Sequence, residues 1–361
     1  MIHSPYTVVL IVPTGIGATI GGYAGDALPI ARAVSQVCDL LITHPNVLNG
    51  AQLYWNHPNI FYVEGYGLDR FAQGDWGLQA VHQNRVGLIL DKGIEQELQI
   101  RHLQAVDATR ATLGLDITDY ILTDTSLNVE LHTATSGTSW GTIGNPDSLL
   151  RAAEKLITQA KVQAIAIVAR FPDDIDSLAL DNYRHGQGVD PVAGAEAVIS
   201  HLIVRQFGIP AAHAPALSPL PLEPNLSPRA AAEELGYTFL PCVLVGLSRA
   251  PRFVHKGGID FTSIPVEYGI WANQVDAVII PDTACGGSAV LSFSQHNTCI
   301  ITVTENQTQL QVTPESLGIQ AIKVNSYLEA LGVLVAHRAG ISISALHSTV
   351  PSLNCFSKIC D

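Results

Sequence analysis

Short apolar segments with the length of buried strands alternate with helical segments along most of the chain. The pattern predicts strands at 7–12, 40–43, 59–63, 86–90, 120–123, 164–169, 239–246, 276–281 and 298–304. It predicts helices at 27–37, 93–112, 147–160, 228–235 and 325–338. Strands that are apolar on both faces and separated by helices are typical of parallel sheets covered on both sides. The sequence therefore predicts an α/β fold with mostly parallel, Rossmann-like sheets covered by helices.

The segment 207–228 interrupts this pattern because it holds six prolines. Proline cannot continue a helix and cannot donate a hydrogen bond inside a central strand. We therefore expect an extended connection between an N-terminal α/β domain, 1–206, and a C-terminal α/β domain, 229–361. A length of 361 residues agrees with two domains at roughly 150 residues each.

Composition narrows the choice of partners. Charged residues make up only 14% of the chain, the net charge is −13, and lysines and arginines do not cluster. Nucleic acid is therefore excluded as an expected partner, because binding a phosphate backbone needs grouped cations. No apolar stretch reaches the ~18 residues of a membrane span, and nothing reads as a secretion signal. We expect a cytoplasmic protein without membrane insertion that binds a small molecule, and we leave a homo-oligomer open.

The cysteines at 38, 242, 285, 299, 355 and 360 are scattered along the chain. This pattern fits free thiols in a reducing compartment better than a disulfide framework. Neither C-x-x-C nor H-x-x-x-H spacing occurs, so no metal site is predicted. The sequence leaves the identity of any cofactor unknown.

The first predicted strand runs into a loop with five glycines. A dinucleotide fingerprint, G-x-G-x-x-G, would need glycine where Ile20 stands and an acidic residue where the next strand ends in Thr43 and His44. Asp26 is expected to cap the following helix. Three interpretations stay open: a phosphate cradle, a structural turn, or a contact to a neutral or cationic ligand. The residues that would approach a ligand are Thr14, Gly15, Gly17, Gly21, Gly22 and Asp26.

His44 and Asn46 directly follow the strand predicted at 40–43. Ligands in open parallel sheets bind beyond the carboxyl ends of the strands, so these side chains should share a crevice with the glycine loop. Histidine changes charge near neutral pH, which suits acid–base chemistry. The alternative is that His44 only forms a hydrogen bond to a loop carbonyl.

Cys285 lies between the strand predicted at 276–281 and a helical stretch, followed by Gly286, Gly287 and Ser288. Helix N–H groups directed at the sulfur would lower the thiol pKa and make Cys285 a nucleophile. Asp282 would orient a base, and His296 would act as that base. The alternatives are that Cys285 lines a ligand or only packs in the core.

Two further polar stretches are candidates for ligand contacts. Arg184 and His185 precede a G-Q-G turn, where they either bind an acidic group or lie exposed at the surface. Ser136, Gly137 and Thr138 belong to a glycine-rich stretch expected to line the same crevice. That stretch lacks the G-x-S-x-G elbow, so a serine hydrolase is not predicted.

Three stretches together resemble a known family: "VPTGIGATIGGYAGDALPIARAVSQVCDLLITHPNVLNGA", "GVDPVAGAEAVISH" with "AAHAPA", and "VDAVIIPDTACGGSAVLSF". The family is catalogued as a domain of unknown function and consists of uncharacterised proteins from cyanobacteria and plastids. The resemblance implies a cytoplasmic setting, or a stromal one in plant relatives. It carries no catalytic residues over.

The favoured hypothesis is an enzyme acting on a small polar metabolite in an interdomain crevice, a metal-independent transferase or hydrolase that uses a Cys/His pair. Glycine-rich and polar loops at strand ends are what a preorganised pocket needs. The first alternative is a non-catalytic ligand-binding or assembly protein of photosynthetic organisms. The second is an NAD(P)-dependent oxidoreductase.

Overall fold

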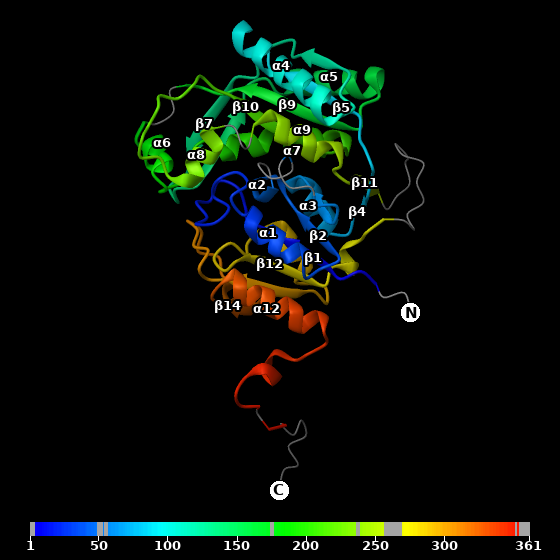
Figure 1. Cartoon of the computed structure of the whole chain (residues 1–361), viewed down its shortest axis with the longest axis vertical. Helices are drawn as coiled ribbons and strands as arrows, with labels where there is room; N and C mark the ends of the chain where they lie inside the picture. The colour runs from blue at the N-terminus through cyan, green and yellow to red at the C-terminus, as the bar shows by residue number, and fades with distance from the viewer. Residues whose placement is uncertain are drawn as a thin grey trace.

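The computed structural model describes residues 4–48, 53, 57–173, 177–235, 239–255, 269–350 and 352–353. Two parallel sheets, each covered by helices, form the body of the molecule (Figure 1). We call the described residues within 4–72 and 269–350 the six-stranded lobe and the described residues within 80–251 the four-stranded lobe. The α/β class with mostly parallel sheets is confirmed.

The six-stranded sheet has the order β14-β13-β12-β1-β2-β3, and all its pairs are parallel. Its strands are β1 (Thr7–Leu10), β2 (Leu40–Thr43), β3 (Ile60–Tyr62), β12 (Ala277–Pro281), β13 (Cys299–Val303) and β14 (Ile322–Val324). Every residue of β1, β2 and β12 is buried, as expected for strands covered on both faces. The strand order reverses between β1 and β12, where Val8 pairs with Leu41 on one side and with Ala277 on the other.

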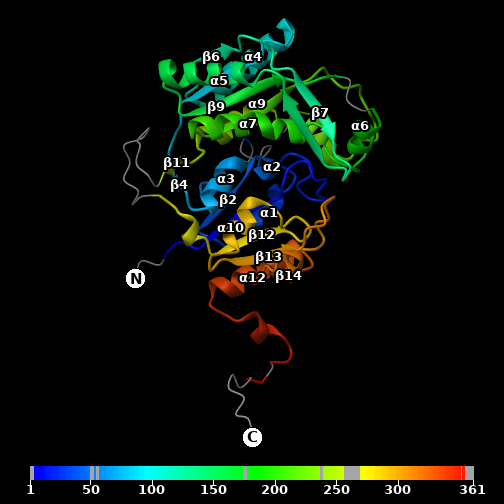
Figure 2. The same cartoon turned by 180° about the vertical axis from the view of Figure 1, so that it is seen from behind.

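Helices cover both faces of this sheet. α1 packs on α12, and α3 packs on α10. Figure 1 shows α1 and α12 in front of the sheet, whereas α10 lies in front in the reversed view of Figure 2. The helices of this lobe are α1 (Leu28–Ser35), α2 (Pro45–Leu48), α3 (Gly65–Ala72), α10 (Ser288–Phe293), α11 (Pro314–Leu317) and α12 (Tyr327–Arg338), with 3-10 turns η3 (Ala272–Gln274) and η4 (Ile343–Leu346).

The four-stranded sheet is also parallel, in the order β10-β9-β5-β6. Its strands are β5 (Val86–Leu90), β6 (Tyr120–Leu122), β9 (Ala164–Arg170) and β10 (Ala211–Ala216). Its helices are α4 (Gln96–Leu113), α5 (Pro146–Lys155) continued by the π-helical turn η1 (Leu156–Ala160), α6 (Ser177–Arg184), α7 (Ala193–Phe207), α8 (Pro228–Glu234) and α9 (Leu240–Ser248). α7 and α9 lie between the two sheets (Figure 1).

Two antiparallel pairs connect the lobes. β4 (Trp76–Gln79) pairs with β11 (Arg252–His255) at the place where the chain passes from one lobe to the other and back. The hairpin of β7 (Val129–Thr133) and β8 (Ser139–Ile143) extends from the four-stranded lobe toward the six-stranded one (Figure 2). The β4–β11 pair and the hairpin lie at opposite edges of the molecule.

Two predicted elements are wrong. The run at 239–246 forms helix α9 rather than a strand, with Pro241 in its first turn, where proline is tolerated. A short apolar run does not distinguish a strand from a helix that is buried on all sides, and α9 is such a helix. Residues 211–216 form strand β10 instead of an extended connection, which Pro215 permits because β10 is at the edge of its sheet.

The strand pairing also contradicts a boundary at 207–228. β1, β2 and β3 share one sheet with β12, β13 and β14, so strands from both ends of the chain build the six-stranded lobe. The segment 207–228 lies inside the four-stranded lobe, where it supplies β10. Local proline content therefore marks an edge of a sheet and not a boundary between domains.

Candidate functional site

The glycine loop after β1 packs tightly against the four-stranded lobe. Gly15 and Gly17 have φ of +72° and +62°, which favours glycine. The Ser139 N–H donates to the Gly15 carbonyl at 3.0 Å. A Cβ atom would lie 2.8 Å from Ser139 Oγ at Gly15 and 2.8 Å from Val189 Cγ2 at Gly17. Protein atoms therefore fill the space next to the loop backbone that a phosphate group would need.

Gly21 and Gly22 are required by close contacts with neighbouring residues of the same segment. Gly21 has φ of +89°, and a Cβ atom there would lie 2.4 Å from Val12 Cγ1. At Gly22 it would lie 2.3 Å from the Ala18 carbonyl oxygen. Both positions fit the interpretation of a structural turn, and Thr14 is the partly exposed residue ahead of it.

The structure brings Asn46 and His44 to this loop, as the strand-end rule predicts. Asn46 Nδ2 donates to the Gly21 carbonyl at 2.5 Å, and the Gly25 N–H donates to the Asn46 carbonyl at 2.9 Å. His44 is buried and its Nε2 accepts from the Val12 N–H at 2.9 Å. Burial lowers the pKa of His44 to about 4, so the ring is neutral at pH 7 and holds the loop in place.

Cys285 does not have the environment of a nucleophile. The thiol is fully buried and donates to the Asp282 and Pro281 carbonyl oxygens at 3.5 and 3.8 Å. Burial, followed by the charges of Asp282 and Glu315, raises the thiol pKa to about 12. The expected lowering of the pKa is therefore wrong, because desolvation dominates over any helix N–H groups.

The expected partners of Cys285 are also occupied or distant. Asp282 accepts from Thr302 Oγ1 at 2.9 Å and pairs with Lys323 Nζ at 2.6 Å. His296 is exposed beyond the far end of α10, a helix whose six residues span about 9 Å. The structure thus does not assemble a Cys285–His296 pair.

We predict that Cys285 resists alkylation in the folded protein. Iodoacetamide at pH 7.5 reacts with thiolates, and a thiol of pKa about 12 supplies very few of them. Mass spectrometry should find Cys285 alkylated at least about 100-fold more slowly in the native protein than in urea. Equal rates in the two conditions would restore the nucleophile hypothesis.

Gly286, Gly287 and Ser288 are exposed at the start of α10. Their loop reaches the glycine loop only indirectly, through residues 308–312. Thr283 Oγ1 lies 2.8 Å from Thr308 Oγ1, and the Gln309 N–H donates to the Ile16 carbonyl at 2.8 Å. The loops after β1 and β12 are therefore neighbours at one edge of the sheet.

The contacts of the remaining predicted residues lie within the four-stranded lobe. Ser136, Gly137 and Thr138 form the tip of the β7–β8 hairpin, where Ser136 Oγ lies 2.9 Å from Thr138 Oγ1. Arg184 is buried and pairs with Glu234 at 2.8 Å, while His185 Nδ1 bonds the Asp181 carbonyl at 2.8 Å. Arg184 is thus committed to a protein carboxylate instead of an acidic ligand.

A group of titratable side chains joins the two lobes beside the glycine loop. We call Tyr23, Asp26, Tyr183, Arg229 and Glu233 the interlobe cluster. The Tyr23 and Tyr183 rings stack with centroids 4.4 Å apart, and Tyr23 Oη donates to the Tyr183 carbonyl at 2.7 Å. Tyr183 Oη donates to Glu233 Oε2 at 2.7 Å, and the Ala24 N–H donates to Glu233 Oε1 at 2.5 Å.

Asp26 does not cap α1, whose N-cap position is Ala27. Its carboxylate instead lies 3.2 Å from Arg229 Nη1. The prediction of a cap was wrong because the loop turns the Asp26 side chain toward α8, where an oppositely charged group is available.

Burial shapes the ionisation of these acids. Desolvation raises the pKa of Asp26 to about 6, although Arg229 lowers it in part, and raises the pKa of Glu233 to about 7. Asp190 keeps some exposed surface, yet burial raises its pKa well above the usual range, and the charges of Glu233 and Glu196 raise it further. Asp190 also accepts from the Val192 N–H at 2.9 Å, near the start of α7. Asp26 and Glu233 are therefore poised to exchange protons near neutral pH.

Two of the histidines with carboxylate partners are on α7 and β10 of the four-stranded lobe. His201 on α7 bonds Glu64, which follows β3, and this pair links the lobes. His213 on β10 lies 3.6 Å from Glu196, and its Nδ1 lies 3.2 Å from Ser200 Oγ. Ser200 is only 2% exposed, so this Ser-His-Glu grouping is a core hydrogen-bond network and not a hydrolase triad.

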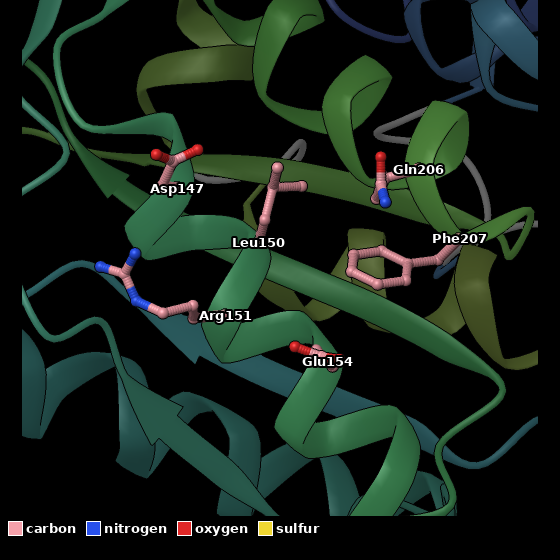
Figure 3. Close-up of a pocket in the computed structure, with 6 residues that line it drawn as sticks. All are labelled: Asp147, Leu150, Arg151, Glu154, Gln206 and Phe207. Atoms are coloured by element: carbon pink, nitrogen blue, oxygen red, sulfur yellow. The ribbon is translucent and has the colours of Figure 1, made fainter.

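The hollow outside the interlobe cluster has fewer features of a binding site. A hollow of about 250 Å³ between α5 and α7 contains none of the predicted site residues, and its Arg151 pairs with Asp124 at 2.7 Å (Figure 3). It is lined by Asp147, Leu150, Arg151, Glu154, Gln206 and Phe207. Among the residues that the structure describes, no three His, Cys, Asp or Glu side chains gather closely enough to hold a metal ion. Within the same ranges, no helix has both the length and the apolar character to cross a bilayer.

Sequence reasoning missed Tyr23, Tyr183, Arg229 and Glu233. One signal was available in α8, which ends in Glu233 and Glu234. Acidic side chains are unfavourable at the C-terminus of a helix, so two glutamates there indicate partners outside the helix.

Comparison with known proteins identifies the family of this chain. A family model described as "Protein of unknown function (DUF3326)" matches residues 7–347. An uncharacterized lipoprotein of Synechococcus sp. is 57% identical over 346 residues, which cover 96% of this chain and 94% of that protein. Comparison with solved structures finds no match. The family resemblance is thereby confirmed.

The same comparison corrects the expected localisation. We predicted a cytoplasmic or stromal setting, whereas the relative carries the name of a lipoprotein. The name of this relative speaks against the cytoplasmic setting that composition and the resemblance had led us to expect.

Proposed function

Since the chain belongs to this DUF3326 family, we propose its function from its own geometry: it binds a small polar metabolite between its two lobes. The interlobe cluster would contact the ligand, and the β4–β11 pair would act as the hinge. This proposal keeps a ligand between two α/β parts of the chain, moves it from the expected crevice between 1–206 and 229–361 to the two lobes, and replaces the Cys/His chemistry.

The observation that carries the proposal is the reversal of strand order between β1 and β12. Order β3-β2-β1-β12-β13-β14 follows the Rossmann-like scheme in which ligands bind beyond the carboxyl ends of the two central strands. The loops that follow β1 and β12 are neighbours through Gln309. The Ser139–Gly15 hydrogen bond supports a location where both lobes reach the ligand.

The connection between the lobes supports opening and closing. The chain crosses twice, and β4 and β11 pair side by side at one edge of the molecule (Figure 1). The glycine loop lies with α6 and α8 at the opposite edge, where a rotation about β4–β11 would separate the lobes most. The contacts of Glu233 with Ala24 and of Tyr23 with Tyr183 would hold the closed form.

A thermal-shift screen of polar metabolites of varied charge tests the proposal. A ligand at 100 times its dissociation constant adds about 2.7 kcal/mol to the free energy of unfolding. We expect at least one compound to raise the melting temperature, and Glu233→Gln to weaken its binding about tenfold or more. Glu154→Gln, in the hollow of Figure 3, is the matched control and should bind normally. A complete screen without binding, or binding lost only in Glu154→Gln, would reject the interlobe site.

A second candidate function is acid–base catalysis on the bound metabolite. Glu233, with a pKa of about 7 and a hydrogen bond from Tyr183, has the ionisation of a general acid or base. NMR of each stabilising compound after incubation with the protein would detect its conversion.

The oxidoreductase alternative lacks support. Thr43 at the end of β2 donates to the Leu10 carbonyl at 2.7 Å, and that position has no acidic side chain to bind the ribose of a dinucleotide.

By analogy with the lipoprotein relative, we propose that the protein is located at a membrane surface.

A further inference from the structure

Asp26 is a buried carboxylate with unfilled hydrogen-bonding capacity. Its side chain is 8% exposed, and neither oxygen accepts a hydrogen bond of good geometry, although the backbone N–H groups of Gly21 and Tyr23 are close enough to favour the ionised form. An ionised carboxylate can accept about four hydrogen bonds, and leaving it unpaired away from water is costly. The nearest cation, Arg229 Nη1, lies 3.2 Å away but is not aligned for a hydrogen bond.

Arg229 enters this site from the surface. Its side chain is 43% exposed, and the same Nη1 donates to the Thr19 carbonyl. Asp26 is buried, so the guanidinium can leave only if another cation takes its place, because removing it alone would leave a buried charge unpaired. A second cation could therefore take the place of the Arg229 guanidinium beside Asp26.

The surroundings favour a cation over an anion. Glu233 accepts a hydrogen bond from the Ala24 N–H of the same loop, and the charge of Asp26 is one of the causes that raise the pKa of Glu233. Glu196 adds a further carboxyl group nearby, whereas the raised pKa of Asp190 favours the neutral form of that group. An anionic ligand would meet this negative field, whereas a cation would relieve it.

We infer that the metabolite carries a cationic nitrogen, a primary ammonium group that donates to Asp26 and displaces Arg229. This inference rests on the proposed interlobe site. An ammonium group suits the position because it is compact and has three freely oriented donors, whereas the planar guanidinium of Arg229 is fixed by its reach from α8. Glu233 would contribute a second negative charge close to the ammonium.

A charge series of four-carbon compounds tests the inference: 1,4-diaminobutane, 1,4-butanediol and succinate, titrated calorimetrically at pH 7.5 in 0.15 M NaCl. We expect 1,4-diaminobutane to bind and the other two to bind at least about tenfold more weakly. Asp26→Asn should weaken diamine binding about tenfold or more, while Arg229→Gln should strengthen it because the competing cation is gone. Opposite effects from neighbouring residues cannot come from a general loss of folding.

Asp107→Asn is the control, because Asp107 is an exposed acid on α4 paired with Arg110 at 2.9 Å. It should bind the diamine like the unmodified protein. Preference for succinate or butanediol that depends on Glu233 would overturn the inference while the interlobe site stands. Diamine binding that Asp26→Asn and Arg229→Gln leave unchanged would also overturn it. Absence of any binder in both the metabolite screen and this series would reject the site itself.

Discussion

Replacing Asp26 with Asn should stabilise the protein at pH 8, by about 1–3 kcal/mol in the free energy of unfolding. Burial raises the pKa of this carboxyl from 3.8 to about 6. Each unit of such a shift corresponds to about 1.4 kcal/mol, so the full shift is worth about 3 kcal/mol. The lower bound allows for the asparagine amide, which must also be buried with few partners.

The sign follows from proton linkage. Between pH 4 and 6 the folded protein binds more protons at Asp26 than the unfolded chain does, so the stability falls as the pH rises through this range. The stabilising contribution is fully present below the unfolded pKa and is lost above about pH 6. Asparagine does not titrate, and the variant should therefore gain over the parent as the pH increases from 4 to 8.

Chemical denaturation of both proteins at pH 4, 6 and 8 measures this difference. Glu233→Gln should behave similarly with a midpoint near pH 7, because its folded pKa is about 7. Asp107→Asn should change the free energy of unfolding by less than about 0.5 kcal/mol at every pH. If Asp26→Asn destabilises the protein equally at all three pH values, the Asp26–Arg229 contact is a structural ion pair and the site argument loses its basis.

A stability cost at this position connects energetics to function. Asp26 and Glu233 contribute charge where folding alone would favour neutral side chains, and residues that weaken the fold while charged are characteristic of binding and catalytic sites. The same two residues face the loop that follows β1, next to the reversal of strand order. Topology and electrostatics thus select the same place independently.

Much of the fold could be predicted because its information is local. The strands at 40–43 and 86–90 match the observed β2 and β5, since fully buried parallel strands are continuous apolar runs. The contact of Asn46 with the glycine loop followed from the rule that strand ends share one edge. The roles proposed for these residues in function stay predictions.

The predictions that were wrong concern properties that depend on tertiary structure. Helix α9 looks like a strand in sequence because its apolar residues follow neither the period of a strand nor that of a half-exposed helix. The pKa of Cys285 depends on burial, which spacing to the next glycine does not reveal. Glu233 lies 209 positions from Ala24, so only the packed lobes make it part of the site.

The closed arrangement of the lobes should fail when Gly194 is replaced with Ala. Gly194 is in the first turn of α7, which packs against β8 of the hairpin. A Cβ atom there would lie 2.3 Å from the Ser139 carbonyl oxygen and 2.4 Å from Trp140 Cα. Both are backbone atoms, so the hairpin itself must move away from the helix.

We expect Gly194→Ala to lower the free energy of unfolding by about 3 kcal/mol, near the upper end of overpacking effects. Alanine's better helix propensity offsets only about 1 kcal/mol of the clash. Gly332→Ala is the matched control, because Gly332 is also helical, in α12, and a Cβ atom there meets nothing within 4 Å. That control should gain about 0.5–1 kcal/mol.

The same substitution should reach the site, because Ser139 is both the residue displaced by the new methyl group and the donor to Gly15. Hydrogen exchange of the Ser139 N–H reports this directly: its protection should fall by at least about tenfold in Gly194→Ala and stay unchanged in Gly332→Ala. The hairpin packs closely on α7 at Gly194 and at Gly141, where a Cβ atom would lie 2.3 Å from Ala195 Cβ. We therefore expect this packing to set the distance between the lobes at the glycine loop. A Gly194→Ala protein with parental stability and an equally protected Ser139 would show that α7 and the hairpin adjust without moving the site.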